Sequence, residues 1–535
     1  MAAPSSLPAR VLLVGFQDQE NLGLRYLVSS LGAHGHVARL VDIKNGPEFV
    51  LAEAQAFRPH VVGFSLIFQY LVPQFASLAE QLRQAGVTAH FTMGGHYPSL
   101  EPAFLFSVIS ELDSIVLFEG EDTLPELAGR VAAGQSWHDL PGLFVHTPQG
   151  DFVTAARRGR HDLDELPWPD RNDIDYLRQP LPTAAILGGR GCTMKCNFCS
   201  IVRFYTGNGT PGRRRRNPQL VVDEIEFLHR QRGVRILLWQ DDDFLCGGTR
   251  GIAWAHSLAH ECITRGLHTH LRWKISCRSD EVTEASLAPL VEAGLSHVYL
   301  GVEAGNPVDL VHLNKNLNPE DHLVAAATLS KLGLSFDYGF MLLQPWSTLE
   351  SAITNVDFLR KFLAGGLSPV VFCRTLPYAG TVMAERLAAE GRLLQKDGAP
   401  DYRFLDLRLD VFYDWLLGVF VEHNFNSSGT AKWLRSLLFI ASLDLPDYPR
   451  DGILLERLQI LTEVSNQVVL DTLASVLEYI SRKEIVSPDD PVLVGLAVHA
   501  AAEDQRLRKD ILTMLSARPN GALRAYFRHR GIESV

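Results

Sequence analysis

The chain of 535 residues is too long for a single ordinary hydrophobic core, so we expect two or three domains. Hydrophobic residues make up 46% and charged residues 21%, which is usual for a globular protein, and no run approaches the roughly 20 apolar residues that span a bilayer. The net charge of −11 argues against a nucleic-acid partner, because an extended binding surface would need a clustered excess of Lys and Arg.

Short apolar runs alternate with helical patterns in the N-terminal part of the chain. Strands are expected at 11–15, 36–41, 60–65, 88–94 and 114–118, and helices at 21–35 and 48–56. Strands that alternate with helices predict a parallel, doubly wound sheet, and ligands bind such sheets beyond the carboxyl ends of the strands. We assign residues 1–136 to this Rossmann-like domain.

Residues 137–182 are rich in Asp, Pro and Arg, and we interpret them as a linker. A second alternation fills 183–400, and its strands are expected at 184–187, 236–240, 272–277, 297–302, 335–342 and 370–376. The helices between these strands predict a partial α/β barrel of six units. Amphipathic helices, for example 454–464 and 467–481, then predict a helical C-terminal subdomain over 401–535 that caps the open end of the barrel.

The seven cysteines are distributed unevenly. An odd number, in a chain whose first residues do not resemble a secretory signal, indicates the reducing cytoplasm rather than a disulfide framework. Three of them, Cys192, Cys196 and Cys199, crowd into the loop after the first predicted barrel strand. Thiolates are the usual ligands of iron–sulfur clusters, and three thiolates for four irons leave one iron open to another ligand. A structural zinc site would need a fourth ligand, and no Cys or His follows at the spacing typical of zinc fingers.

The CxxxCxxC spacing, with Phe198 before the last cysteine, resembles that of the radical S-adenosylmethionine (SAM) superfamily. The resemblance implies that the open iron of a 4Fe–4S cluster chelates SAM and that reduction cleaves SAM to a 5′-deoxyadenosyl radical. It also implies an electron donor such as flavodoxin or ferredoxin.

Later segments resemble the SAM-binding elements of the same superfamily, in barrel order. The residues implied are Gln240, Asp241 and Asp242, for backbone contacts with the SAM amino group; Arg278, for the SAM carboxylate or ribose; and Glu303, for the wall of the pocket. The segment 377–381 resembles the one that follows the sixth strand. Each charged residue, taken singly, could equally belong to an ordinary surface pair at a strand end.

The N-terminal domain carries a second pattern. The order and spacing of Asp18, Gly23, Ser65 and the pair Gly94 and Gly95 resemble the DxHxxG…SxL…GG pattern of cobalamin-binding domains. Ser65 and the glycines are expected to line a slot for the nucleotide tail, since glycine lets the backbone approach closely.

Three further residues follow strand ends that face this slot: His96, Glu119 and Gly120. His96 could contact the amide or phosphate periphery of cobalamin, or be an ordinary loop histidine.

Glu20 stands where the cobalamin-binding pattern has the histidine that ligates cobalt. A carboxylate is a poor substitute for imidazole, so we expect cobalamin with its own base displaced and no protein nitrogen on cobalt. The alternative is that Glu20 is merely a solvated loop residue.

Two weaker features remain. The run Arg213 to Arg216 predicts a solvated, salt-bridged loop, with the alternative that one guanidinium binds a phosphate or carboxylate. Trp239, Trp273 and Trp346 lie near strand ends, and core packing is the expected role of each.

Together the two patterns resemble the cobalamin-dependent (class B) radical SAM enzymes. The resemblance implies a methyltransferase that acts on an unactivated carbon, or secondarily phosphorus, of a small-molecule or natural-product intermediate, with methyl supplied by methylcobalamin. A non-methylating oxidative cyclase or rearrangement enzyme would share every motif. A methylthiotransferase is disfavoured because no cysteine precedes Cys192. A cobalamin-binding sensor with a degenerate barrel is disfavoured because the CxxxCxxC motif is intact.

Overall fold

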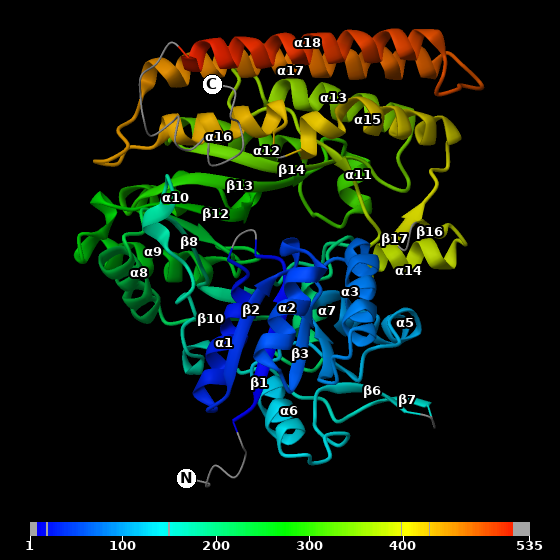
Figure 1. Ribbon diagram of the computed structural model, residues 1–535. Coiled ribbons are helices and arrows are strands. Elements are labelled where there is room, and N and C mark those ends of the chain that lie inside the picture. The colour runs from blue at the N-terminus through cyan, green and yellow to red at the C-terminus, as the bar shows by residue number, and fades with distance from the viewer. Residues whose placement is uncertain (1–7, 18–19, 148–149, 397–398, 427, 517–535) are drawn as a thin grey trace.

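The computed structural model describes residues 8–516 apart from 18–19, 148–149, 397–398 and 427. Figure 1 shows three layers: an N-terminal α/β domain at the bottom, a strongly curved sheet with outer helices in the middle, and long helices at the top. The α/β class and the three-part architecture expected from the sequence are confirmed.

The N-terminal sheet has five parallel strands in the order β2-β1-β3-β4-β5. They are β1 (Arg10–Gly15), β2 (Val37–Asp42), β3 (Val61–Ser65), β4 (His90–Gly94) and β5 (Ser114–Val116). The helices around them are α1 (Leu22–Ala33), α2 (Pro47–Phe57), α3 (Val72–Gln84), α4 (His96–Leu100), α5 (Pro102–Val108) and α6 (Thr123–Ala132). The inner strands β1, β3 and β4 and the short β5 have mostly buried side chains, whereas β2 at the edge buries only Val41. Buried apolar runs explain why the doubly wound pattern can be predicted from the sequence.

The expected linker contributes to this sheet. Strands β6 (Leu143–Thr147) and β7 (Gly150–Val153) lie within 137–182 and extend the sheet with antiparallel pairing beyond β5. The Asp- and Pro-rich part of the segment then runs back between the two α/β layers, where Arg25 donates to Asp170 O at 2.9 Å.

The second sheet has six parallel strands in chain order and forms an open half-barrel. They are β8 (Thr183–Ile186), β11 (Ile236–Trp239), β12 (Arg272–Arg278), β13 (Leu295–Glu303), β14 (Ser335–Leu343) and β15 (Cys373–Arg374). The connecting and flanking helices are α7 (Ile201–Thr206), α8 (Pro218–Arg232), α9 (Thr249–Thr264), α10 (Glu284–Glu292), α11 (Pro307–His312), α12 (Pro319–Lys331), α13 (Leu349–Phe362) and α14 (Val382–Ala389). The three tryptophans expected to pack in the core do so.

Two small hairpins accompany the half-barrel. Strands β9 (Gly189–Gly191) and β10 (Arg213–Arg215) pair at its carboxyl edge, and β16 (Leu393–Lys396) pairs with β17 (Ala399–Tyr402) after α14.

The C-terminal helices are α15 (Leu407–Phe425), α16 (Thr430–Ser442), α17 (Gly452–Ser481) and α18 (Pro491–Ser516). The expectation of two helices at 454–464 and 467–481 is wrong, because α17 runs unbroken through both. Asn466, which lies between the two expected helices, donates to Ser368 O and accepts from Val370 N–H, so its polarity is satisfied in the tertiary structure. No helix among the described residues is long and apolar enough to cross a bilayer.

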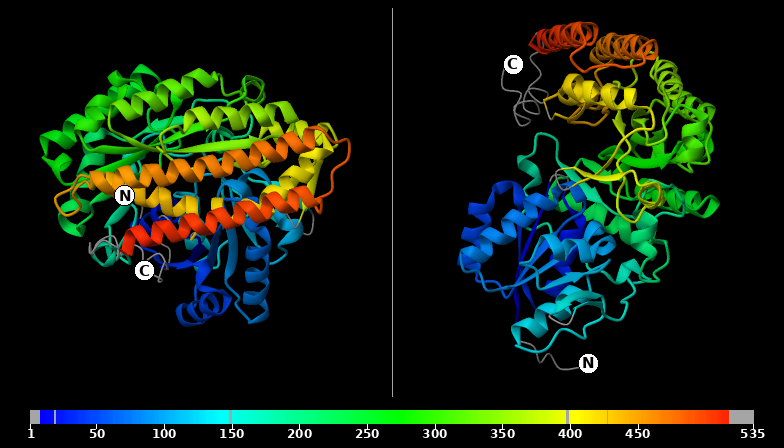
Figure 2. Two further views of the ribbon diagram at one scale, coloured as in Figure 1. Left: turned by 90° about the horizontal axis from the view of Figure 1, so that it is seen from above. Right: turned by 90° about the vertical axis from the view of Figure 1, so that its right-hand side faces the viewer.

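Helix α16 packs against the hollow side of the half-barrel. Its Arg435 lies 3.0 Å from Asp337 on β14, which also contacts Lys274 at 3.0 Å and His297 at 3.2 Å. Burial alone would raise the pKa of Asp337, but these three cationic or ionisable partners hold it well below its usual range. The helical subdomain is therefore tied to the inside of the sheet by charge as well as by apolar contacts; Figure 2 shows α17 and α18 as the outermost layer.

Buried ion pairs join the N-terminal domain to the half-barrel. Arg190 on β9 contacts Glu119 at 2.5 Å and Glu121 at 2.6 Å, and all three side chains are 8% exposed. Arg214 on β10 adds a contact of 2.8 Å to Glu119. Since the carboxylates follow β5 and the arginines follow β8, these pairs set how the two sheets face each other.

Of the four consecutive arginines, Arg214 and Arg216 are buried and Arg213 and Arg215 are half-buried, so the expectation of a solvated loop is wrong, while the expected salt bridges are present. Arg213 contacts Asp241 at 3.0 Å and Arg216 contacts Glu224 at 2.6 Å. Arg215 donates to two main-chain carbonyls, Phe244 O and Cys246 O. Each guanidinium has its own partner because β10 lies between the two domains instead of on the surface.

Replacing Arg190 by Met should lower the free energy of unfolding by about 3–5 kcal/mol, because it leaves Glu119 and Glu121 with fewer cationic partners in a buried place. Urea denaturation followed by circular dichroism measures this loss. The exposed pair of Arg178 and Asp175 provides the control, since Arg178→Met should cost no more than about 1 kcal/mol. Equal losses in the two variants would contradict the role given to Arg190.

Candidate functional site

A cavity of about 730 Å³ lies between the carboxyl ends of the N-terminal strands and the edge of the half-barrel. Most of the residues expected to bind cobalamin line it: Gly23, Ser65, Gly94, Gly95, His96, Glu119 and Gly120. Asp18 lies outside the described residues. Leu187, Arg190, Phe204 and Tyr205 close the cavity from the half-barrel side.

The turn after β4 shows why glycine stands in this wall. Gly95 has φ of +115°, in the region that glycine alone adopts easily. A Cβ atom there would lie 2.3 Å from Leu66 O, so the neighbouring chain leaves no room for a side chain. The main chain of this turn therefore borders the cavity without a side chain at Gly95, as expected for a slot that holds a nucleotide tail.

Glu20 does not face the cavity. It has φ of 53°, and its carboxylate accepts from Ala185 N–H at 3.2 Å and lies 3.4 Å from Arg171 Nε. Burial raises the pKa of Glu20, and Arg171 opposes that rise. Arg171 also pairs with Glu224 at 2.8 Å. The alternative of a solvated loop residue is wrong: the side chain of Glu20 is 12% exposed and bridges the N-terminal domain and the start of the half-barrel.

His96 begins α4, and its ring stacks on Phe204 of α7 with centroids 3.9 Å apart. Burial lowers the pKa of His96 to about 4, so the imidazole is neutral at physiological pH. Its Nε2 is buried, and no described residue forms a hydrogen bond with it. His96 thus lies in the wall of the cavity with a buried, unused ring nitrogen, whereas the carboxylate of Glu119 is already paired with arginines.

The three cysteines lie on the loop that follows β9. Asn197, within this loop, donates from its main chain to Leu313 O and from its side chain to His312 O, while Met383 N–H donates to Asn197 O. The loop is thereby anchored on α11 and α14. Phe198 packs against the barrel core.

The thiols are free, and burial raises the pKa of Cys196 and raises that of Cys199 to about 11. They are protonated at neutral pH without a metal, so cluster binding must release protons.

The acidic run after β11 holds the cluster loop. Asp241 accepts from Gly188 N–H and Asp242 accepts from Gly191 N–H, each at 2.8 Å. Both side chains are thus used to fasten β9, which leaves the main chain of this segment for the SAM contacts that the resemblance implies. Gln240 and Asp242 also line the 730 Å³ cavity.

Arg278 ends β12 beside the cysteine loop. It contacts Asp280 at 2.9 Å and donates to Lys315 O at 2.8 Å, yet its buried Nη1 has no partner among the residues that the structure describes. Glu303 ends β13 with φ of 69° and pairs with Lys315 at 3.2 Å. A buried cation with an unused donor fits the carboxylate of SAM.

Sequence reasoning missed three groups. Arg171 and Arg190 form ion pairs between the domains, with Glu20 and with Glu119 and Glu121 respectively. The acidic residues after the predicted strand at 114–118 could have indicated that an arginine lies opposite them. Cys246 lies 4.0 Å from Cys192 although 54 residues separate them, and nothing in the sequence marks that contact.

Gln69 was the third group missed. It donates to Pro377 O and accepts from Ala379 N–H across the domains. Phe68 and Tyr70 beside it line the cavity.

Comparison with known proteins agrees with both patterns. Residues 11–128 match the model of the B12 binding domain, and residues 186–358 match that of the Radical SAM superfamily. The chain is 26% identical over 403 residues to the hopanoid C-3 methylase of Methylococcus capsulatus, covering 74% of this chain and 72% of the relative. It is 28% identical over 298 residues to the anaerobic magnesium-protoporphyrin IX monomethyl ester cyclase of Rubrivivax gelatinosus, covering 53% and 51%.

Two solved structures share the fold. The cobalamin-dependent SAM radical enzyme OxsB, with aqua-cobalamin and SAM bound, has a TM-score of 0.70 at 16% identity and covers 99% of this chain and 85% of its own. The radical SAM methyltransferase TsrM of Kitasatospora setae, with cobalamin and a [4Fe–4S] cluster bound, has a TM-score of 0.59 at 21% identity and covers 72% and 75%.

The cofactors follow from the two matched domains: a 4Fe–4S cluster and SAM from the second, cobalamin from the first. The cysteine loop, the unused donor of Arg278 and the glycine-walled cavity fit these three groups. With its B12-binding domain followed by a radical SAM domain, the chain belongs to the cobalamin-dependent radical SAM enzymes.

Proposed function

We propose that this enzyme is a methyltransferase that methylates an unactivated carbon, or secondarily phosphorus, of a small-molecule or natural-product intermediate. The observation that carries the proposal is the wall of the 730 Å³ cavity. Residues of the cobalamin slot, such as Ser65, and residues beside the cysteine loop, such as Gln240, line one space. A substrate held there has access to both cofactors. When bound, cobalamin supplies a transferable methyl group and the cluster supplies the electron that cleaves SAM.

The chain's own residues have three tasks in this proposal. Cys192, Cys196 and Cys199 hold the cluster, and Asp241 and Asp242 keep their loop in place through Gly188 and Gly191. Arg278 directs its free Nη1 to the SAM carboxylate. Ser65, the glycine pair and His96 border cobalamin. Electrons come from a donor such as flavodoxin or ferredoxin, in a reducing cytoplasm.

A non-methylating reaction is the second candidate. It is favoured by the relatives named as cyclases, which match 45–75% of this chain at 24–28% identity. The relatives named as methyltransferases, at 23–26% identity, favour the first candidate.

Product analysis distinguishes methylation from the non-methylating reaction. The protein, reconstituted anaerobically with iron, sulfide and cobalamin, should convert SAM to 5′-deoxyadenosine and S-adenosylhomocysteine in equal amounts and add one methyl group to the substrate. Cys199→Ala is the control and should lose 5′-deoxyadenosine. Substrate turnover with 5′-deoxyadenosine but without S-adenosylhomocysteine would contradict methylation and select the second candidate.

Arg278→Lys should weaken SAM binding about 10- to 100-fold, because hydrogen bonds to charged groups contribute about 1.5–3 kcal/mol and lysine cannot reproduce the guanidinium fork. Equilibrium dialysis with labelled SAM measures the dissociation constant. The matched control is Arg360→Lys, which alters a surface pair with Asp471 and should leave it unchanged. Wild-type affinity in Arg278→Lys would exclude the proposed contact.

If cobalamin is bound, its cobalt should carry no nitrogen from the protein or from the cofactor's own base, because Glu20 stands in the sequence where the pattern has histidine and its carboxylate is turned to Arg171 and Ala185. The electron paramagnetic resonance spectrum of the cob(II)alamin form should therefore lack nitrogen splitting. Splitting that disappears in His96→Gln would show that the free nitrogen of His96 binds cobalt instead. Splitting that persists in that variant would place the cofactor's own base there.

A further inference from the structure

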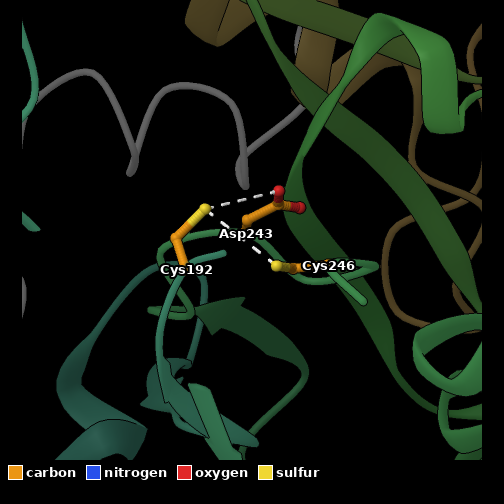
Figure 3. Close-up of side chains that lie close together, drawn as sticks. All are labelled: Cys192, Asp243 and Cys246. Atoms are coloured by element: carbon orange, nitrogen blue, oxygen red, sulfur yellow. Dashed lines mark hydrogen bonds between the residues drawn. The ribbon is translucent and has the colours of Figure 1, made fainter. Parts of the chain in front are cut away.

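A fourth thiol lies beside the cluster loop. Figure 3 shows Cys192, Asp243 and Cys246 converging from two loops, the first after β9 and the other two after β11. The Sγ atoms of Cys192 and Cys246 are 4.0 Å apart, and Cys192 Sγ is 3.9 Å from Asp243 Oδ2. All three donor atoms lie within 4.8 Å of one another.

These distances approach those of one tetrahedral metal centre. With zinc–sulfur bonds of about 2.3 Å, two sulfur ligands lie about 3.8 Å apart, and a sulfur and a carboxylate oxygen lie about 3.6 Å apart. The two distances from Cys192 Sγ differ from these values by a few tenths of an ångström, and the distance from Cys246 Sγ to the Asp243 oxygen is within 4.8 Å. Two thiolates and a carboxylate suit a thiophilic divalent cation, with water in the fourth position.

The position is also preformed. Arg215 donates to Phe244 O and Cys246 O, so β10 fastens the loop that carries Asp243. A Cβ atom at Gly251 would lie 2.1 Å from Leu245 O, which shows how tightly this loop turns against α9. Cys246 is 1% exposed and Asp243 is 4% exposed.

Among the described residues the carboxylate of Asp243 has an acidic neighbour, Glu281, whose pKa is raised to about 9 by burial and then by the charge of Asp243. Asp243 Oδ1 is buried without a hydrogen-bond donor among these residues. Leaving a carboxylate oxygen buried and unpaired costs free energy that a cation would remove.

We propose that Cys192, Cys246 and Asp243 bind a mononuclear thiophilic cation of the Zn²⁺ type in the cluster-free protein. The cation replaces the two thiol protons, which are released to solvent, and no electron is transferred. Because Cys192 belongs to both sets, this site and the 4Fe–4S cluster exclude each other. The inference rests on the proposed function only in taking Cys192 as a cluster ligand.

Cobalt(II) binding to the full-length, cluster-free protein under anaerobic, reducing conditions tests the site. One equivalent of Co²⁺ should bind with thiolate-to-cobalt charge-transfer absorption and tetrahedral visible bands, and Zn²⁺ should displace it. Cys246→Ser should weaken binding at least about tenfold, the lower end of the effect of altering a metal's surroundings. Cys196→Ser and Cys199→Ser should bind Co²⁺ as the wild type does.

The opposite pattern would overturn the proposal. Loss of the absorption in Cys199→Ser together with wild-type binding in Cys246→Ser would place the cation on the cluster cysteines. Cys262→Ser, a buried thiol on α9, controls for the loss of a core cysteine.

X-ray absorption of the Zn²⁺-loaded wild type gives an answer that does not depend on any variant folding. Two sulfur ligands per zinc support the site, and three contradict it. SAM and cobalamin are absent from both measurements, so failure here leaves the methyltransferase proposal untouched. Likewise, a product analysis that contradicts methylation would not affect the proposal of the metal site.

Discussion

The buried contact of Arg190 with Glu119 and Glu121 is the constraint on which the site depends. Each sheet alone presents its strand ends to a different ligand, and a reaction that uses both ligands needs the two edges to face each other. Arg190 on β9 binds the acidic turn after β5 and so brings the edges together. Charge pairs taken out of water are costly to break, which makes this relative placement of the domains strict rather than loose.

Carboxylates also hold neighbouring segments in place in the acidic segment after β11. Asp241 holds β9 through Gly188, Asp242 holds it through Gly191, and Asp243 turns toward Cys192. Three consecutive carboxylates thus position one loop from three directions. This explains how a loop with three protonated thiols keeps its shape before a cluster occupies it. Glu20, which stands where the cobalamin-binding pattern has histidine, likewise contacts Arg171 and so joins the domains.

Local patterns predicted most of the fold and the type of site. The strands are short apolar runs, and the cysteine spacing is compact, so both are legible without the structure. What failed depends on distant partners. Asn466 does not interrupt α17 because Ser368 and Val370 satisfy it, and Arg214 is buried because Glu119 lies opposite. Cys246 approaches Cys192 only because β8 and β11 are neighbours in the sheet.

The central claim is that the cluster and cobalamin occupy one chamber. Pulsed electron paramagnetic resonance on protein that holds both the reduced cluster and cob(II)alamin measures this directly. The account predicts a dipolar interaction between the two spins and faster relaxation of each in the presence of the other. Two spectra that superimpose on those of the singly loaded proteins would contradict it, because the cofactors would then lie in separate sites.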